Sequence, residues 1–89
     1  MKAVITVTGR DNIGIIARVS GLLYQNEINI LDISQTIMQD IFTMITLVDT
    51  TNSKLDFAQL KAELDKVGEE LSVAITIQRE DLFNSMHRI

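Results

Sequence analysis

The 89-residue sequence predicts an α+β fold in which two helices cover one face of a four-stranded antiparallel sheet. Segments that alternate apolar and polar residues are typical of half-buried strands, and segments with apolar residues three and four apart are typical of helices. The two kinds of segment follow one another in the order βαββαβ. No linker, repeat or low-complexity segment divides the chain, so a single domain is expected.

The first half of the chain predicts a strand, a helix and a long second strand. Residues 3–8 alternate and are rich in β-branched side chains, as strands are. A polar loop with Gly9, Arg10 and Gly14 leads into a helix over residues 14–25, and residues 28–39 read as a strand. The apolar stripe of this helix consists of Ile15, Ile16, Val19, Leu22 and Leu23.

The second half predicts a hairpin partner, a second helix and a last strand. Gln39 and Asp40 form a two-residue turn, so residues 41–50 return antiparallel to residues 28–39. Asp56, followed three residues later by Gln59, predicts a capping box at the start of a helix that stops near Gly68. Residues 71–78 alternate as the last strand. The stripe of the second helix consists of Phe57, Leu60, Leu64, Val67 and Leu71.

Right-handed crossovers bring the strands at 3–8 and 41–50 to the centre of the sheet and leave the other two at its edges. This is the ferredoxin-like two-layer sandwich. The hairpin strands carry apolar residues on both faces, namely Ile37, Ile41, Phe42, Met44 and Ile45. Because helices cover one face only, a neighbouring subunit is expected to cover the excess, with edge strand 28–39 pairing side by side in a homodimer.

Composition excludes several classes of function. The chain has no cysteine, which removes disulfides, thiolate nucleophiles and sulfur-ligated zinc. His87 is the single histidine, so no metal site and no cofactor are predicted. No Ser-His-Asp order, catalytic carboxylate pair or Walker loop is visible, which argues against an enzyme.

Charge and hydropathy limit the partners. The net charge of −4 and the aromatic content of 4% argue against direct binding of nucleic acid. No stretch approaches the roughly 20 apolar residues that a membrane span needs. We therefore expect a protein that is soluble, cytoplasmic and not attached to a membrane.

The segment TGRDNIGIIARVSGLLYQNEINILDISQ, residues 8–35, resembles the ACT domain, a small-molecule regulatory module. The likeness is strongest to the freestanding versions similar to glycine-cleavage transcriptional regulators. In that family the recurring turn begins with an acidic or amide residue, which is usually followed by an Arg-Pro pair. A glycine and then an aliphatic residue complete the turn, and the five positions correspond here to residues 11–15. Asn12 and Ile13 replace the Arg-Pro pair. The resemblance assigns residues 1–80 to an ACT-like domain and 81–89 to a C-terminal tail.

The resemblance implies a ligand site between two subunits. In ACT domains that bind amino acids, the site lies between this turn and the second strand of a neighbour. The implied site residues are Asp11, Asn12, Gly14, Ile15 and Asn29. The residue chemistry agrees, because N–H groups at a helix start suit a carboxylate and Asp11 could accept a hydrogen bond from an ammonium group. An unidentified protein partner would then receive the regulatory signal.

Other roles stay open for the same residues. Gly14 could serve the turn or close helix packing, Asp11 could be the helix N-cap, and Asn29 could close the turn before its strand. The alternative functions are a ligand-free assembly module and an enzyme similar to acylphosphatase. That enzyme would use Arg10 or Arg18 with Asn29, although its Gly-rich loop is missing here.

Overall fold

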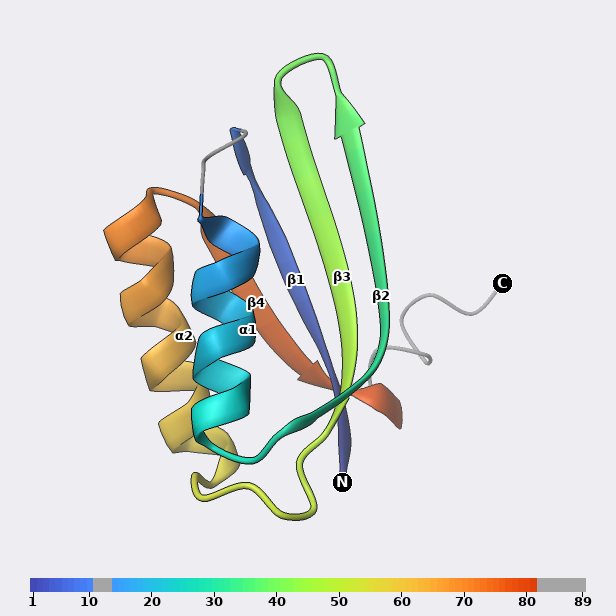
Figure 1. Cartoon of the computed structure of the whole chain (residues 1–89), viewed down its shortest axis with the longest axis vertical. Helices are drawn as coiled ribbons and strands as arrows, with labels where there is room; N and C mark the ends of the chain where they lie inside the picture. The colour runs from blue at the N-terminus through green and yellow to red at the C-terminus, as the bar shows by residue number, and fades with distance from the viewer. Residues whose placement is uncertain (11–13, 82–89) are drawn as a thin grey trace.

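The computed structural model describes residues 1–10 and 14–81 and has the predicted βαββαβ order (Figure 1). Asp11, Asn12 and His87 lie outside the described residues. The elements are β1 (Lys2–Arg10), α1 (Ile15–Gln25), β2 (Asn29–Met38), β3 (Ile41–Asp49), α2 (Phe57–Leu71) and β4 (Ala74–Arg79).

The four strands form one antiparallel sheet in the order β2-β3-β1-β4, as predicted. Both helices lie on the same face of this sheet, toward the β1 and β4 side, while the β2–β3 hairpin extends beyond them (Figure 1). The fold is therefore the ferredoxin-like sandwich, and its hairpin has no helix above its outer part.

The core lies between the helices and one face of the sheet. Ala3, Ile5 and Val7 of the central strand β1 are fully buried, because their side chains all point to the helix-facing side. The helices contribute buried residues at helical spacing, namely Val19 and Leu23 from α1 and Leu60, Leu64 and Val67 from α2. These residues belong to one hydrophobic core between the helices and the sheet.

The predicted capping box at the start of α2 is confirmed. The Asp56 carboxylate accepts a hydrogen bond from the Gln59 N–H at 2.8 Å, and the Gln59 side-chain oxygen accepts one from the Asp56 N–H at 2.9 Å. These two bonds use donors that a helix start otherwise leaves without partners.

The apolar stripe predicted for the first helix was wrong at one position. The side chain of Ile16 is 41% exposed, whereas Ile15 is 2% exposed. Successive residues of a helix point about 100° apart, so only one of two adjacent isoleucines can face the core at that level. Ile15 holds this position.

Three predicted boundaries were also wrong. The second helix does not stop near Gly68 but continues to Leu71, where Ser72 ends it in the left-handed conformation. The last strand consequently begins at Ala74 instead of residue 71. Gly9 and Arg10 belong to β1 and not to the loop, because they pair with Phe42 and Ile41 of β3. The strand β1 is longer than predicted because its last residues pair with β3. The pattern of a single segment carries no information about such pairing.

Thr46 of β3 is 1% exposed, and its hydroxyl has no hydrogen-bond partner in the described part of the chain. A buried hydroxyl without a partner costs about 1–3 kcal/mol, and valine has nearly the same shape. We expect Thr46→Val to raise the free energy of unfolding in urea by about 1 kcal/mol. Thr46→Ser keeps the hydroxyl and removes the methyl group, so it should lower that free energy. A loss of stability in Thr46→Val would show that the hydroxyl has a partner.

Candidate functional site

The turn before α1 requires a glycine for its backbone conformation. Gly14 is the N-cap residue of α1 and has φ 96°, in the left-handed region that favours glycine. A Cβ at Gly14 would meet no described atom within 4 Å, so close helix packing does not explain the residue. The alternative in which Asp11 is the N-cap residue is also wrong, since Gly14 holds that position.

The start of α1 has the electrostatics of an anion site. The N–H groups of the first helical residues have no acceptor within their own helix, and the helix dipole makes this end positive. Gly14 has no side chain to cap them, and the first turn of α1 contains no acidic residue. Ile15 holds the first turn against the core through its buried side chain. A carboxylate could therefore bind at this end.

Arg18, one turn into α1, is paired with Glu70 of α2. Its guanidinium donates two hydrogen bonds to the Glu70 carboxylate, at 2.7 and 2.9 Å. The bond from Arg18 lowers the pKa of the Glu70 carboxyl and raises the pKa of the guanidinium. Because the folded-state pKa of Glu70 is the lower one, any stability from this pair is present at neutral pH and is lost as the pH falls through the acid range.

The enzyme alternative needs Arg10 or Arg18, and each of these arginines lies near a carboxylate. Arg18 binds Glu70, and Arg10 lies 3.8 Å from the Asp40 carboxylate at the exposed end of the hairpin. An arginine that holds a substrate phosphate should be free to turn toward it. The two hydrogen bonds to Glu70 therefore disfavour Arg18 in that role, whereas Arg10, whose side chain is 88% exposed, makes only a long ion pair.

Asn29 lies far from the turn in its own chain. It is the exposed first residue of β2, directly after α1, whereas Gly14 lies at the other end of that helix. With 11 residues, α1 is about 16 Å long. One chain therefore does not bring Asn29 to Gly14 and Ile15, and a site that contains all three needs a second chain.

The turn before β2 does not depend on Asn29. The N–H groups of Asn26 and Ile28 donate to the carbonyl of Leu23, and the Asn26 side chain donates to the carbonyl of Leu22 at 2.9 Å. Glu27 takes the left-handed conformation with φ 59°. These bonds close the turn by residue 28, which leaves the Asn29 side chain available.

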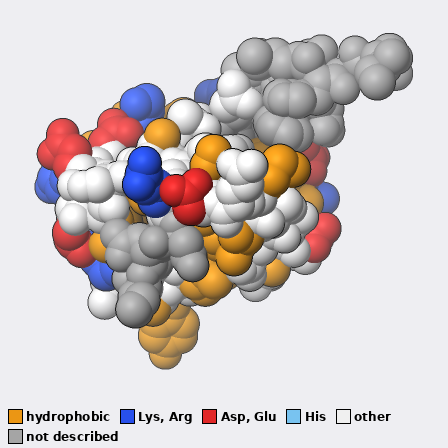
Figure 2. Space-filling model, turned by 90° about the horizontal axis from the view of Figure 1, so that it is seen from above, with side chains coloured by type: hydrophobic (Ala, Val, Ile, Leu, Met, Phe, Trp, Pro, Cys, Tyr) orange, Lys and Arg blue, Asp and Glu red, His pale blue; other side chains and the backbone are white. Residues whose placement is uncertain are grey.

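The β2–β3 hairpin exposes apolar side chains on both faces, as predicted for Ile37, Ile41 and Ile45, whereas the predicted Phe42 and Met44 are buried in the core of the same chain. Every residue of β2 is exposed, and its outer edge pairs with no described strand. The register sets Ile33 and Ile37 on the helix-facing side and Met38, Ile41 and Ile45 on the other. Seen from above, hydrophobic side chains gather toward the middle of the molecule, with most charged ones toward its sides (Figure 2). Ile30, Leu31 and Ile33 are also exposed. The sequence did not predict this, because the expected apolar residues all lay near the turn of the hairpin.

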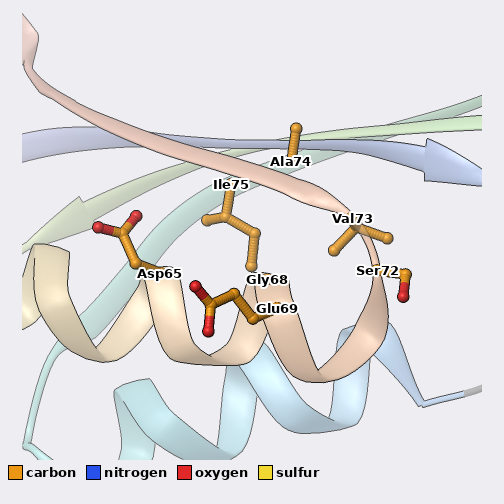
Figure 3. Close-up of a pocket in the computed structure, with 7 residues that line it drawn as sticks. All are labelled: Asp65, Gly68, Glu69, Ser72, Val73, Ala74 and Ile75. Carbon is orange, nitrogen blue, oxygen red and sulfur yellow. The ribbon is translucent and has the colours of Figure 1, made fainter.

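A hollow of about 580 Å³ lies elsewhere, between the end of α2 and the start of β4 (Figure 3). Its lining includes the carboxylates of Asp65 and Glu69 beside the apolar Val73 and Ile75. None of the predicted site residues lines it, and its charged side chains are acidic. The hollow therefore does not suit the carboxylate expected at α1.

Residues 1–10 and 14–81 contain no group of three or more His, Cys, Asp or Glu side chains placed to hold a metal ion. Within the same residues, neither helix is both long and apolar enough to cross a membrane.

The fold and the glycine turn define a class of small α+β domains in which the first strand delivers the chain to the start of a helix. The family model described as ACT domain matches residues 2–78. The chain belongs to the ACT domain family, as the resemblance of its first turn indicated.

Relatives match nearly the whole chain. A UPF0237 protein from Methanocaldococcus jannaschii is 56% identical over 88 residues, which are 99% of this chain and 98% of the relative. A UPF0237 protein from Clostridium acetobutylicum is 57% identical over 89 residues, which are 100% of both chains. These relatives are of the freestanding type.

Several solved structures have a fold similar to that of this chain. An ACT domain protein from Streptococcus pneumoniae is 44% identical with a TM-score of 0.81, covering 93% of each chain. A formyltetrahydrofolate deformylase from Burkholderia mallei has a TM-score of 0.79 at 19% identity, covering 88% of this chain and 28% of that one. A protein described as a glycine cleavage system transcriptional repressor has a TM-score of 0.73 at 24% identity, covering 86% and 44%. The last two show a shared fold alone.

Proposed function

We propose that the chain is a non-catalytic regulatory protein that forms a homodimer through β2 and binds a free amino acid at the seam. ACT domains are generally regulatory domains that bind ligands. A structural relative, the regulatory subunit of aspartate kinase from Thermus thermophilus, has a TM-score of 0.65 at 28% identity, covering 86% of this chain and 50% of that one. The observation that supports the proposal is the separation of the predicted site residues, because Asn29 can join Gly14 in one site only from a second chain.

The edge of β2 supports the dimer. A long, exposed strand whose outer edge is unpaired is a template for another strand, and soluble proteins normally protect it. Here β2 is exposed along all ten residues, and Ile33 and Ile37 stand beside the helix layer without cover. Two copies related by a two-fold axis would pair these edges and bury both isoleucines.

The two ends of an amino acid match the two kinds of group at the seam. The carboxylate would accept hydrogen bonds from N–H groups at the start of α1, where Gly14 allows close approach. The ammonium group would donate to Asp11, and Asn12 would complete the turn. The amide of Asn29 from the other subunit both donates and accepts, so it could bind either end. Binding at the seam would then shift the assembly, and with it any protein partner.

Calorimetric titration with each common amino acid tests the site. We expect at least one to bind the wild type, and Asp11→Ala and Asn29→Ala each to weaken that binding at least about tenfold, the loss of one good polar contact. Asn52→Ala changes an exposed asparagine in the loop after β3 and should bind like the wild type. If no amino acid binds at millimolar concentration, the ligand part of the proposal is wrong.

A mixing experiment tests whether the site uses two chains. In a dimer of one Asp11→Ala chain and one Asn29→Ala chain, one site has both residues intact and the other has neither. Random exchange of subunits should therefore restore about a quarter of the sites, each at wild-type affinity. A site formed within one chain would show no recovery on mixing.

A further inference from the structure

We propose that the hollow between the end of α2 and the start of β4 is a docking site for an extended segment of a partner protein that carries a lysine or arginine beside aliphatic residues. The hollow is separate from the turn before α1 and from the β2 seam, and the proposal depends on neither. We call this surface the acidic hollow. The described residues that line it are Asp65, Gly68, Glu69, Ser72, Val73, Ala74 and Ile75.

The floor of the acidic hollow is apolar. The Ile75 side chain points from β4 toward Gly68 of α2 (Figure 3), where a Cβ would lie 3.6 Å from Cγ1 of Ile75. Ile75 is buried and Val73 is partly buried, so both form the base of the hollow and neither projects from it. The volume of about 580 Å³ lies within the range of about 300–1,000 Å³ for ligand pockets, so a long side chain fits.

Two carboxylates border this floor. Asp65 and Glu69 are four residues apart on α2, so they share one side of the helix, and both lie near Ile75 (Figure 3). The Glu69 carboxylate has no hydrogen-bond or ion-pair partner in the described part of the chain. Asp65 binds Lys61 at 3.2 Å, but these side chains are 53% and 58% exposed, and such exposed pairs are weak. Both carboxylates are therefore available to a cation from another molecule.

The charge at the end of α2 is opposite to the charge that stabilises a helix end. The helix dipole makes the C-terminal end negative, so cations are favoured there and carboxylates are not. The last turn of α2 contains Glu69 and Glu70 and no basic residue. Arg18 of α1 neutralises Glu70, but no described residue neutralises Glu69. A cation from a partner would supply the charge that this helix end lacks.

The edge of β4 favours a protein segment over a free amine. The strand β4 pairs with β1 on one side and with no described strand on the other. An extended segment can donate and accept backbone hydrogen bonds along such an edge, while its alternate side chains enter the adjacent hollow. A lysine or arginine would then reach the two carboxylates, and an aliphatic side chain two residues along would cover the apolar floor.

Other occupants fit the acidic hollow less well. The net charge of −4 and the two carboxylates disfavour nucleic acid, an anionic lipid surface and the same hollow of a second copy. A calcium ion takes six to eight oxygen ligands, and the described residues provide no group of three side chains that could hold a metal ion. A basic and partly aliphatic segment is therefore the complement of this surface.

Fluorescence anisotropy with a labelled hexapeptide that alternates lysine and valine tests the acidic hollow. We expect the peptide to bind the whole chain at millimolar concentration or below, and more weakly as the salt concentration rises. Glu69→Lys should weaken binding at least about fivefold, because a repulsion replaces an attraction. This variant should still fold, since a cation is favoured at this helix end. Circular dichroism would show whether it does.

Glu63→Lys is the matched control, because it makes the same change of charge on the same helix. Glu63 is seven residues before Glu70 and therefore shares the side of α2 that faces α1, away from the hollow. The peptide should bind this variant within about twofold of its wild-type affinity at physiological salt, where distant charges are screened. Asp11→Ala should also bind it like the wild type, which separates this site from the amino-acid site.

Control ligands define the occupant. A peptide that alternates lysine and serine should bind at least about threefold more weakly, because it buries no aliphatic side chain. A peptide that alternates glutamate and valine should not bind. If spermine binds as tightly as the lysine-valine peptide, the hollow accepts a free amine and the proposal of a protein segment is wrong. No binding of the lysine-valine peptide, or equal losses in Glu69→Lys and Glu63→Lys, would also overturn it.

Discussion

Ile15→Ala should lower the free energy of unfolding by about 2–5 kcal/mol, the range for truncating a buried isoleucine. Ile15 is the first residue of α1, and its side chain lies in the core with Val19 and Leu23. The substitution removes apolar contacts and leaves a cavity at the end of the helix that carries the proposed ligand site. Unfolding in urea, followed by circular dichroism at one fixed protein concentration, measures the change.

Ile16→Ala is the matched control for this experiment. It removes the same atoms from the next residue, whose side chain points outward, and should lower the free energy of unfolding by less than about 1 kcal/mol. Equal losses in the two variants would contradict the orientation of α1 described above. They would instead favour the stripe that the sequence alone predicted.

Gly68→Ala should lower the free energy of unfolding by about 1–3 kcal/mol, the usual cost of overpacking a filled site. Gly68 is buried within α2, and a Cβ there would lie 2.9 Å from the backbone oxygen of Val73. That oxygen belongs to the tight connection in which the Val73 N–H donates to the carbonyl of Gly68 at 2.9 Å. Both the Cα of residue 68 and the Val73 oxygen belong to the backbone, so neither can shift easily to relieve the contact. The clash should therefore outweigh the better helix propensity of alanine.

Gly21→Ala provides the same substitution with the opposite expected sign. Gly21 lies in the interior of α1, and a Cβ there would meet no described atom within 4 Å. Alanine should therefore raise the free energy of unfolding by about 0.5–1 kcal/mol, because it restricts the unfolded chain and favours the helix. If both variants were stabilised, the contact between the end of α2 and β4 would be looser than the structure shows.

Local chemistry explains why most of the fold could be predicted. The capping box at Asp56 and Gln59 depends on residues three apart, and the two-residue turn at Gln39 and Asp40 joins adjacent strands. Alternation in β1 and the helical spacing in α2 reflect which side of each element is buried. Each of these signals lies within a few neighbouring residues, so a single segment contains all the information needed.

The errors arose where contacts between distant segments decide the outcome. A glycine in a helical pattern reads as a stop, but Gly68 is there because the chain returns past it at Val73. The end of β1 at Gly9 and Arg10 depends on Phe42 and Ile41 across the sheet. Helical spacing allowed either Ile15 or Ile16 to face the core, and the placement of α1 on the sheet selected Ile15.

Some features of the candidate site could likewise be predicted from the sequence, and others required the tertiary structure. The sequence by itself determined the βαββαβ order, the glycine turn before α1 and the ACT resemblance, because each depends on local spacing. Only the tertiary structure decided that Asn29 and Gly14 lie at opposite ends of α1 and that Arg18 is bound to Glu70. These features depend on the direction in which each element crosses the core, which is set by packing among residues far apart in the chain.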